Sequence, residues 1–325
     1  MSEKLKLDIS IAEYPHTRKL ISGEIPIEGV EANFIEVKPQ IGAFRRMVRD
    51  VEFDVCELAP TTYIIARAHG APFKALPIFV MRTFHHGTMV KLPDAGIETP
   101  KDLEGKKVGI RAYSVTTCVW NRQILQEEYG VDLSKITWVV DDEEHVQALK
   151  LPPNVIHAPE GRSLYDMMAD GEIVAGSSGN SGVGRTGSPT GGWKTVKTDW
   201  PKLIPDAAER DKADFDATGV YPMHGTIVVK DEILAKHPWV AQALCDAFRK
   251  AKEDWMADWQ KGIGDTKDDE KYRKLAKIVG DPLPYGMEPN LPTINALRIA
   301  AFKQGLTPRL MELDETFLDP LTVSA

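Results

Sequence analysis

The chain has 325 residues, of which 42% are hydrophobic and 27% are charged, as is usual for a soluble globular protein. Its formal net charge of -8 argues against a nucleic-acid-binding role, which needs a dominant positive field. The three cysteines are far apart and form no CxxC pair, which excludes a disulfide framework and a cysteine-based zinc site. At ~150 residues per domain, this length predicts about two domains.

The first residues lack the pattern of a signal peptide, which needs a basic segment and then an apolar run of roughly 7–15 residues. Lys4, Lys6 and Asp8 interrupt the apolar residues that could form such a run. Elsewhere no apolar stretch approaches the ~20 residues that cross a bilayer. We therefore expect a cytoplasmic protein without a membrane contact.

The first 90 residues alternate between the apolar periods of strands and helices. Strands are expected at 5–11, 30–37, 53–58 and 75–81, and helices at 40–50 and 61–69. This β–α–β order predicts parallel strands that are joined by right-handed crossovers.

A second α/β unit begins near residue 90. Its strands are expected at 107–111, 136–140 and 173–175, and its helices at 115–129 and 164–169. The segment 176–192 is rich in glycine and serine, and it is interpreted as a mobile flap or an excursion at the edge of the lobe. Gly182 to Gly187 match GxGxxG, but no helix is expected to follow them, so a dinucleotide site is rejected.

The rest of the chain is mainly helical, with helices expected at 206–217, 238–259 and 291–304 and a strand at 226–229. This strand predicts that the chain returns to its first unit. We expect an α/β fold of two lobes, with 1–89 and 225–325 in lobe one and 90–224 in lobe two. A cleft between two such lobes is a common place for a small ligand.

Seven segments, in order over nearly the whole chain, carry a family resemblance. They are HTRKL (16–20), EFDVCELAPTTYI (52–64), RTFHHG (82–87), DLEGKKVGIRAYSVTTCVWNRQIL (102–125), TGVYPMHGTIVV (218–229), HPWVAQAL (237–244) and DPLPYGMEPN (281–290). They resemble the 4,5-dihydroxyphthalate decarboxylase family, whose fold is similar to that of type 2 periplasmic substrate-binding proteins. The resemblance implies non-oxidative decarboxylation of a hydroxylated aromatic acid. The most direct substrate is 4,5-dihydroxyphthalate, which would give protocatechuate.

His86 and His224 are the histidines expected to transfer protons. Each lies beside one of the two expected lobe crossings, and histidine has an unperturbed pKa near neutral pH. Their positions and the family resemblance together favour a role in proton transfer. The alternative for each is a structural histidine that is hydrogen-bonded to the backbone. The other histidines considered are interpreted as structural: His16, His69, His145, His157 and His237.

Three arginines are expected near the carboxyl ends of strands, where a ligand of the cleft would lie. They are Arg18, Arg82 and Arg111. A guanidinium group presents a planar fork that matches a carboxylate in bidentate fashion. The alternative for each is a surface ion pair, which contributes little to stability.

Glu57 ends a mostly apolar strand and is followed by Thr61 and Thr62. Carboxylates are rarely buried without a partner or a chemical task. In the resemblance Glu57 falls on the family's matching acid, where it could take a proton from a ring hydroxyl or hold a histidine in one tautomer. A buried Glu–Arg pair that orders the lobe is the alternative.

Tyr113, Ser114, Thr116 and Thr117 form a polar run that opens a helix. The free N–H groups and the positive dipole end of a helix N-terminus favour an anion, here a substrate carboxylate. Ser114 is also a plausible N-cap, a role that needs no ligand.

Glu57, His86 and His224 could in principle form a two-histidine, one-carboxylate metal set, but no HxH or HxxxH spacing supports it. We therefore expect proton transfer without metal or cofactor, with the acid undecided between His86 and His224. The expected partner is a small aromatic carboxylate, and a homo-oligomer is left open. The alternative function is a non-catalytic solute-binding protein for an aromatic or organic acid in ABC-type uptake.

Overall fold

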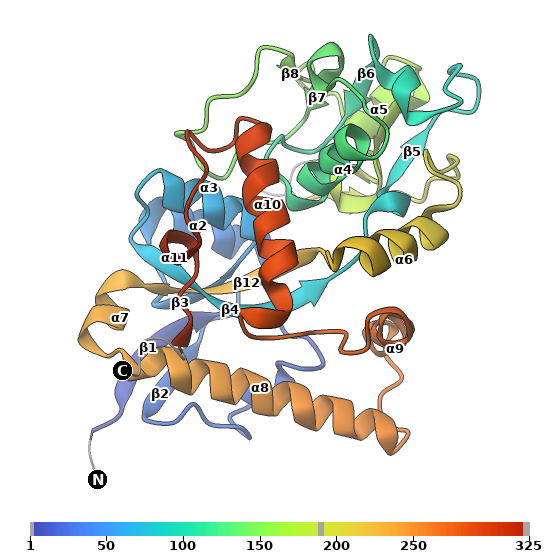
Figure 1. Cartoon of the computed structure of the whole chain (residues 1–325). Coiled ribbons are helices and arrows are strands. Elements are labelled where there is room, and N and C mark those ends of the chain that lie inside the picture. The colour runs from blue at the N-terminus through green and yellow to red at the C-terminus, as the bar shows by residue number, and fades with distance from the viewer. Residues whose placement is uncertain (1–2, 188–191, 321–325) are drawn as a thin grey trace. The chain divides into compact units, whose positions relative to one another are not determined.

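The computed structural model describes residues 3–187 and 192–320 of the chain (Figure 1). The chain folds into two compact units. Unit 1 draws its described residues from Met1–Arg82, Met223–Ile294 and Met311–Ala325, and unit 2 from Thr83–Pro222 and Asn295–Leu310.

Within the described residues, unit 1 is built on a sheet of five strands in the order β2-β1-β3-β12-β4. The strands are β1 (Leu5–Ser10), β2 (Val30–Phe34), β3 (Val55–Leu58), β4 (Phe73–Arg82) and β12 (Met223–Lys230). β1 pairs in parallel with β2 and β3, as the sequence predicts. The returning strand β12 lies between β3 and β4 and runs antiparallel to both, so the sheet is mixed and the expectation of parallel neighbours fails there.

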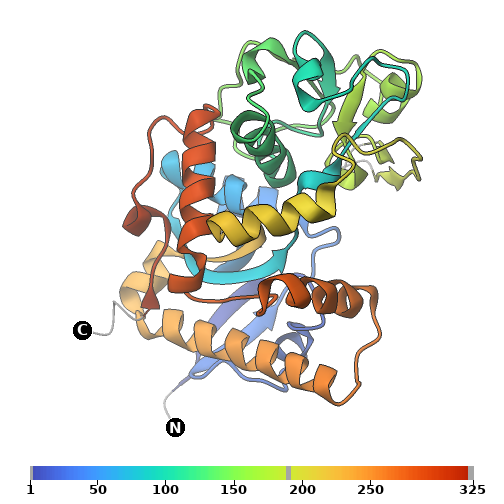
Figure 2. The same cartoon turned by 45° about the vertical axis from the view of Figure 1, so that its right-hand side comes forward.

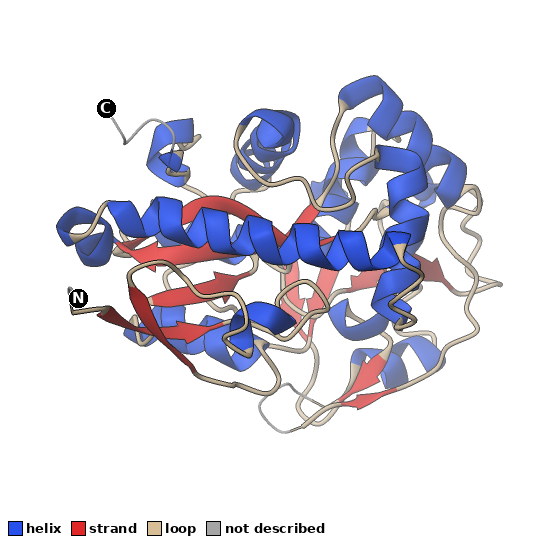
Figure 3. Cartoon of the chain, turned by 90° about the horizontal axis from the view of Figure 1, so that it is seen from below, coloured by secondary structure: helices blue, strands red, loops and turns tan. Residues whose placement is uncertain are grey.

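Helices cover the sheet of unit 1. They are α1 (Arg18–Ile21), α2 (Ile41–Asp50), α3 (Pro60–Ala68), α7 (Asp231–Lys236), α8 (Trp239–Gln260), α9 (Lys267–Val279), the 3-10 turn Glu288–Asn290 and α11 (Leu313–Thr316). Figure 3 shows α8 lying across the strands. Its apolar stripe, which includes Leu244 and Phe248, packs in one core with Leu7 and Ile9 of β1. Burial of this stripe, more than helix propensity, stabilises the helix.

Unit 2 contains a second sheet, in the order β5-β9-β6-β7-β8 over the described residues. Its strands are β5 (Met89–Lys91), β6 (Lys107–Gly109), β7 (Thr137–Val140), β8 (Val155–His157) and β9 (Ala175–Ser177), beside a hairpin of β10 (Arg185–Thr186) and β11 (Lys194–Thr195). Its helices are α4 (Thr116–Glu127), α5 (Leu164–Ala169) and α6 (Ala207–Thr218), with 3-10 turns at His86–Thr88, Pro100–Leu103, Leu133–Lys135 and Gly179–Ser181. Within the five-stranded sheet β5 is antiparallel to β9 and the other pairs are parallel, and β10 and β11 pair antiparallel with each other.

The helix α10 (Leu291–Lys303) begins in unit 1, but Asn295–Leu310 group with unit 2 before the chain returns to unit 1 at Met311. This differs from the expected boundaries, which keep 291–304 in lobe one. A buried pair of hydrogen bonds holds the end of this segment to α4: Nε of Arg122 donates to Oε1 of Gln304 (2.8 Å), and Nε2 of Gln304 donates to the Val119 carbonyl (3.0 Å). Hydrogen bonds of this kind cannot be recognised from hydrophobic periodicity.

The described part of the glycine-rich segment, 176–187, is packed and is not a flap. Val183 and Arg185 are fully buried. A Cβ on Gly184 would come 2.5 Å from Cα of Gly179, and one on Gly182 would collide with the Ser177 carbonyl. The glycines therefore allow close backbone packing, and the flap interpretation is wrong for these residues. Residues 188–191 of the segment lie outside the described ranges.

Over the described ranges, no helix combines the length and the apolar character that crossing a membrane requires.

Candidate functional site

A buried carboxylate stands at the centre of the candidate site in unit 1. Glu57 of β3 is 1% exposed. Its Oε2 accepts a hydrogen bond from the Ala12 N–H (3.0 Å), and its Oε1 accepts one from the Tyr14 hydroxyl (2.8 Å). Burial raises the pKa of Glu57, and these two hydrogen bonds oppose the rise. The partners are an amide and a phenol, so the Glu–Arg pair considered from the sequence is not what holds this acid.

His224 lies on β12, the strand that pairs with β3. It directly precedes Gly225, where a Cβ would lie 2.9 Å from Oε1 of Glu57. The pairing of β12 with β4 shifts register on both sides of Gly225, and such irregularities change the direction of side chains near active sites. Burial lowers the pKa of His224 to about 3, and the Lys271 ammonium adds to this. The structure thus brings Glu57 and His224 into one region of unit 1.

His16 lies in the same region, which the sequence analysis did not anticipate. His16 is 1% exposed, and its ring stacks on Tyr14 with centroids 5.3 Å apart and planes 1° apart. Trp255 and Tyr272 contact it from two other sides, at 5.1 Å and 6.0 Å. These contacts join the turn after β1 to α8 and α9, which lie side by side (Figure 2).

The ring nitrogens of His16 have no hydrogen-bond partner within residues 3–187 and 192–320. Burial lowers the pKa of His16 to about 3; the backbone of Val80 favours the charged ring without forming an aligned hydrogen bond. Two cations, Lys252 and Lys271, lower it further. His16 is therefore neutral at neutral pH.

We call Tyr14, His16, Glu57, His224 and Lys271 the acid–base cluster. Burial also lowers the pKa of the Lys271 ammonium, which lies on α9. Groups with shifted pKa values that gather in one place are typical of catalytic sites. The sequence signal for His16 and Tyr14 was available, because both lie in the turn at the carboxyl end of β1 and HTRKL begins with His16. It was missed because a single histidine in a turn is usually structural.

Thr61 and Thr62 lie in the first turn of α3, directly after the strand of Glu57, and are 0% and 2% exposed. They are close to Glu57 in sequence, and their expected contact with a substrate stays a prediction.

The arginines expected in unit 1 have different surroundings. Arg18 is exposed on α1 and pairs with Glu13 at 3.2 Å. Arg82 is fully buried: its Nη2 donates to the Pro284 carbonyl (3.3 Å) and to Oδ1 of Asn290, and its guanidinium lies 5.0 Å from the centre of the Phe79 ring. The contacts of Arg82 tie β4 to the 284–290 segment, so part of its fork is used inside unit 1.

His86, in unit 2, is held between two carboxylates. Its Nδ1 lies 2.7 Å from Oδ1 of Asp211 on α6, and its Nε2 lies 2.7 Å from Oε1 of Glu128 at the end of α4. Burial lowers the pKa of His86, but these two hydrogen bonds outweigh it and raise the pKa to about 9. Both ring nitrogens are engaged, and the ring is a cation at neutral pH.

The polar residues before α4 bind a carboxylate, which is the side chain of Glu144 of the same chain. The N–H groups of Tyr113 and Ser114 donate to Glu144 at 2.6 Å and 3.1 Å, and the Ser114 hydroxyl donates to it as well. Thr116 opens α4 and is 2% exposed. Nearby along the chain, Arg111 is 8% exposed, with Nε 4.0 Å from Asp142.

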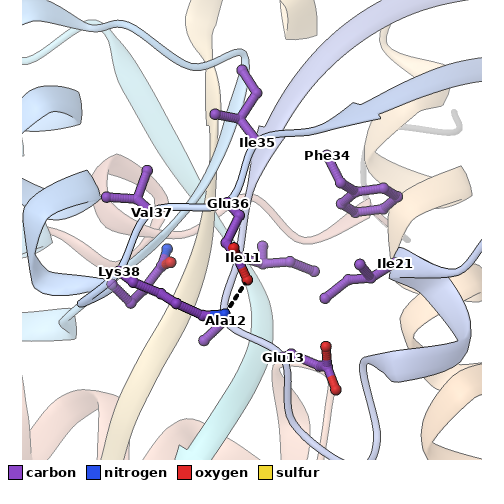
Figure 4. Close-up of a pocket in the computed structure, with 10 residues that line it drawn as sticks. Ile11, Ala12, Glu13, Ile21, Phe34, Ile35, Glu36, Val37 and Lys38 are labelled. Carbon is purple, nitrogen blue, oxygen red and sulfur yellow. Dashed lines mark ion pairs between the residues drawn. The ribbon is translucent and has the colours of Figure 1, made fainter.

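A pocket of about 410 Å³ lies in unit 1 at the carboxyl ends of β1 and β2 (Figure 4). Its apolar walls include Ile11 and Phe34, and in Figure 4 Lys38 reaches Glu36, an ion pair of 2.5 Å. The pocket touches Ala12, whose N–H holds Glu57. Two carboxylates and one ammonium among its charged residues make it a poor match for a dianion.

The possible metal set was Glu57, His86 and His224. Among the described residues, no three His, Cys, Asp or Glu side chains form a group that could hold a metal ion.

Solved structures with this fold come from binding proteins and from an enzyme. A periplasmic sulfonate-binding protein from Methylobacillus flagellatus covers 100% of this chain and 94% of its own, with a TM-score of 0.59 and 11% identity. The periplasmic aliphatic sulphonate-binding protein of Escherichia coli gives a TM-score of 0.53 at 12% identity, over 98% of this chain and 93% of its own. The desulfurization enzyme DSZB gives 0.50 at 13% identity, over 99% of each. The chain therefore has the periplasmic-binding-protein-like α/β fold.

Sequence comparisons are more specific. Residues 24–151 match the family described as ABC transporter, phosphonate, periplasmic substrate-binding protein. A 4,5-dihydroxyphthalate decarboxylase from Comamonas testosteroni is 32% identical over 97% of this chain and 96% of its own length. One from Pseudomonas putida is 38% identical over 53% of this chain and 69% of its own length. The chain belongs to the 4,5-dihydroxyphthalate decarboxylase family.

Proposed function

We propose that this protein removes one carboxylate of 4,5-dihydroxyphthalate as carbon dioxide and releases protocatechuate. The observation that carries the proposal is the 32% identity to a protein named for this reaction, over 96% of that protein's length. The acid–base cluster supports it, because the reaction consists of proton transfers around one bond cleavage.

The chemistry requires an acid at a ring carbon and a base at a ring hydroxyl. Direct loss of carbon dioxide would leave an unstable aryl anion. Protonation of the carbon that bears the leaving carboxylate, with loss of the proton from the hydroxyl para to it, gives a dienone. The bond to the carboxylate then breaks, its electron pair restores the aromatic ring, and the oxygen takes its proton back. One proton is consumed overall.

In this proposal His224 protonates the ring carbon and Glu57 accepts the hydroxyl proton. His224 is neutral without substrate, but the two negative charges of a bound phthalate would raise its pKa and load it with a proton. Glu57 has a raised pKa, so it is a stronger base than an exposed carboxylate. His86 is not assigned a proton-transfer role, because both of its nitrogens are already bound.

Carboxylate binding in unit 1 is proposed for Thr61 and Thr62, which open α3 directly after the strand of Glu57. A grip on the leaving carboxylate would stabilise the ground state, so these residues are expected to hold the carboxylate that is retained.

The test is turnover by purified protein. Incubation with 4,5-dihydroxyphthalate should release carbon dioxide and protocatechuate in equal amounts. His224→Asn should abolish release while binding of phthalate, which lacks the hydroxyls, stays within about threefold. Near-normal turnover by His224→Asn would remove this residue from the mechanism.

The second candidate function is solute binding, which the match to a substrate-binding family and the fold favour. Tight binding of 4,5-dihydroxyphthalate with no carbon dioxide released would establish it in place of catalysis.

We further propose that the protein acts in the cytoplasm. Its three cysteines are free and buried, which fits a reducing compartment. Cell fractionation with an antibody against the chain tests this, and recovery in the periplasmic fraction would contradict it.

A further inference from the structure

The buried position of Glu57 raises a question about its proposed role as base. At 1% exposure its carboxylate has little surface through which to meet a ligand. One oxygen is taken by the Ala12 N–H, and the other by the Tyr14 hydroxyl. Of these two donors, only Tyr14 can pass a proton, because a backbone amide does not ionise under these conditions.

Tyr14 keeps part of its surface exposed, whereas Glu57 does not. It lies in the turn between β1 and α1, and its hydroxyl oxygen has lone pairs that can accept a hydrogen bond while it donates to Glu57. A ligand that contacts this hydroxyl would therefore be connected to the buried acid.

Two hydrogen bonds fix the main chain of Tyr14, and one ring contact orients its phenol. The Tyr14 N–H donates to Oγ1 of Thr17 (2.8 Å), and the Tyr14 carbonyl accepts from the Arg18 N–H (3.0 Å). The His16 ring stacks flat on the phenol at 5.3 Å. Because His16 is neutral and makes no hydrogen bond within the described part of the chain, it does not compete for the Tyr14 hydroxyl.

The electrostatics suit a group that stays neutral. Burial raises the pKa of Tyr14 well above its ordinary value, and the Glu57 carboxylate raises it further. A tyrosinate beside Glu57 is thus unfavourable, and Tyr14 would have to gain one proton as it loses another.

We propose that Tyr14 is a further catalytic residue, which relays the substrate's hydroxyl proton to Glu57, and that His16 is its positioning residue. The inference rests on the proposed decarboxylation. In the forward step the substrate O–H bond breaks and a new O–H bond forms on Tyr14. At the same time the original Tyr14 O–H bond breaks and its proton bonds to Oε1 of Glu57. When carbon dioxide leaves, both protons return, so Tyr14 and Glu57 are regenerated.

Kinetics of Tyr14→Phe, Glu57→Gln and the double variant test the relay. Tyr14→Phe keeps the ring that stacks on His16 and removes only the hydroxyl, so kcat should fall by about 100-fold or more. Glu57→Gln can still accept a hydrogen bond but cannot take the proton, and it should cause a similar loss. The double variant should be no slower than the slower single variant, because the two groups act as one unit. Losses that multiply, or an unchanged kcat in Tyr14→Phe, would overturn the relay.

Tyr63→Phe is the matched control. Tyr63 is also a buried tyrosine of unit 1, and its hydroxyl donates to the Thr316 carbonyl. Its loss should lower thermal stability and leave kcat and KM unchanged. A loss of kcat as large as that of Tyr14→Phe would mean that any lost hydroxyl in this unit disturbs turnover, and it would overturn the assignment to Tyr14.

A binding experiment distinguishes failure of the relay from failure of the proposed function. Trp255, which contacts His16, offers a fluorescence signal for titration with 4,5-dihydroxyphthalate and with phthalate. If Tyr14 contacts a ring hydroxyl, the preference of the wild type for the hydroxylated ligand should fall by up to about tenfold in Tyr14→Phe. If the wild type releases no carbon dioxide, the proposed function fails, and the ratio of the two affinities still tests the contact between Tyr14 and a ring hydroxyl. A preference that is lost in Tyr14→Phe supports this contact. A preference that is unchanged overturns it.

Discussion

Gly225 lies directly against the carboxylate of Glu57: a Cβ at this position would come 2.9 Å from Oε1 of Glu57 and 2.7 Å from Cγ2 of Val80. The backbone of β12 thereby closes one side of the buried acid. Because β12 is the strand that also carries His224, the glycine sets how closely the strand bearing the proposed acid approaches the proposed base.

Gly225→Ala should therefore impair both stability and turnover. The added methyl must displace Glu57 or β12, and overpacking of this kind costs about 1–3 kcal/mol. We expect a lower midpoint in urea unfolding and a loss of kcat of about tenfold or more, since small misplacements of catalytic groups are costly. Release of carbon dioxide from 4,5-dihydroxyphthalate measures the second effect.

Gly42→Ala is the control for that substitution. Gly42 lies in α2, and the atom that its Cβ would approach is Cγ1 of Val37 at 3.2 Å. Alanine is favoured over glycine inside a helix by about 1 kcal/mol, so stability should hold or rise and turnover should not change. Wild-type turnover in Gly225→Ala would show that the close approach at Glu57 has no functional importance.

Unit 2 should lose stability at high pH, because His86 loses the proton that holds it between two carboxylates. Its pKa is raised from 6.5 to about 9 in the folded protein. A group with a raised folded pKa contributes stability that is fully present below about pH 6.5 and is lost as the pH passes through about 9. Since the Glu128 side chain is 26% exposed, solvent screening reduces the effect, and we expect about 1–3 kcal/mol.

His86→Gln tests this by removing the titrating group. Thermal unfolding of wild type and variant should differ most near pH 6.5 and converge near pH 9.5. If the unfolding temperatures of wild type and variant differ by the same amount at every pH in this range, the contacts of His86 with Asp211 and Glu128 do not stabilise the unit. His157→Gln, at an exposed histidine of the same unit, should leave the wild-type curve unchanged.

Periodicity could predict much of the fold because the core follows it closely. The strands of Leu7, Val55 and Ile227 and the stripe of α8 that includes Leu244 all come from local patterns. The antiparallel insertion of β12 could not be predicted, since a strand's direction in a sheet depends on where a distant segment returns. The grouping of Asn295–Leu310 with unit 2 likewise involves non-local hydrogen bonds of Gln304.

For the site, residue type predicts an unusual environment where burial is rare for that type. A glutamate in an apolar strand is informative in this way: Glu57 is buried, and its role as a base stays a prediction. The sequence does not single out His16 and Tyr14, because turns commonly carry histidine and tyrosine, and the contacts of His16 with α8 and α9 are visible only in the fold. Conversely, the sequence does not reveal that His86 would be enclosed by Asp211 and Glu128.

Arg82→Lys should weaken unit 1 even though the charge is kept. A lysine cannot reproduce the forked contacts to the Pro284 carbonyl and to Asn290. We expect a loss of about 1–3 kcal/mol, because buried acceptors are left unpaired. Urea unfolding of this variant and of Arg18→Lys, whose arginine is exposed, should separate the two sites. Equal and small effects would contradict a structural role for Arg82.

Glu144→Ala should loosen the N-terminus of α4. The substitution removes the acceptor of the Tyr113 and Ser114 N–H groups, and leaving such donors unpaired costs about 1–3 kcal/mol. Hydrogen exchange followed by mass spectrometry should show faster exchange in peptides that cover 113–118. Glu143→Ala removes a neighbouring, exposed carboxylate and should change stability by no more than about 0.5 kcal/mol. Unchanged exchange in Glu144→Ala would mean that another group satisfies these amides, and that the carboxylate does not cap the helix.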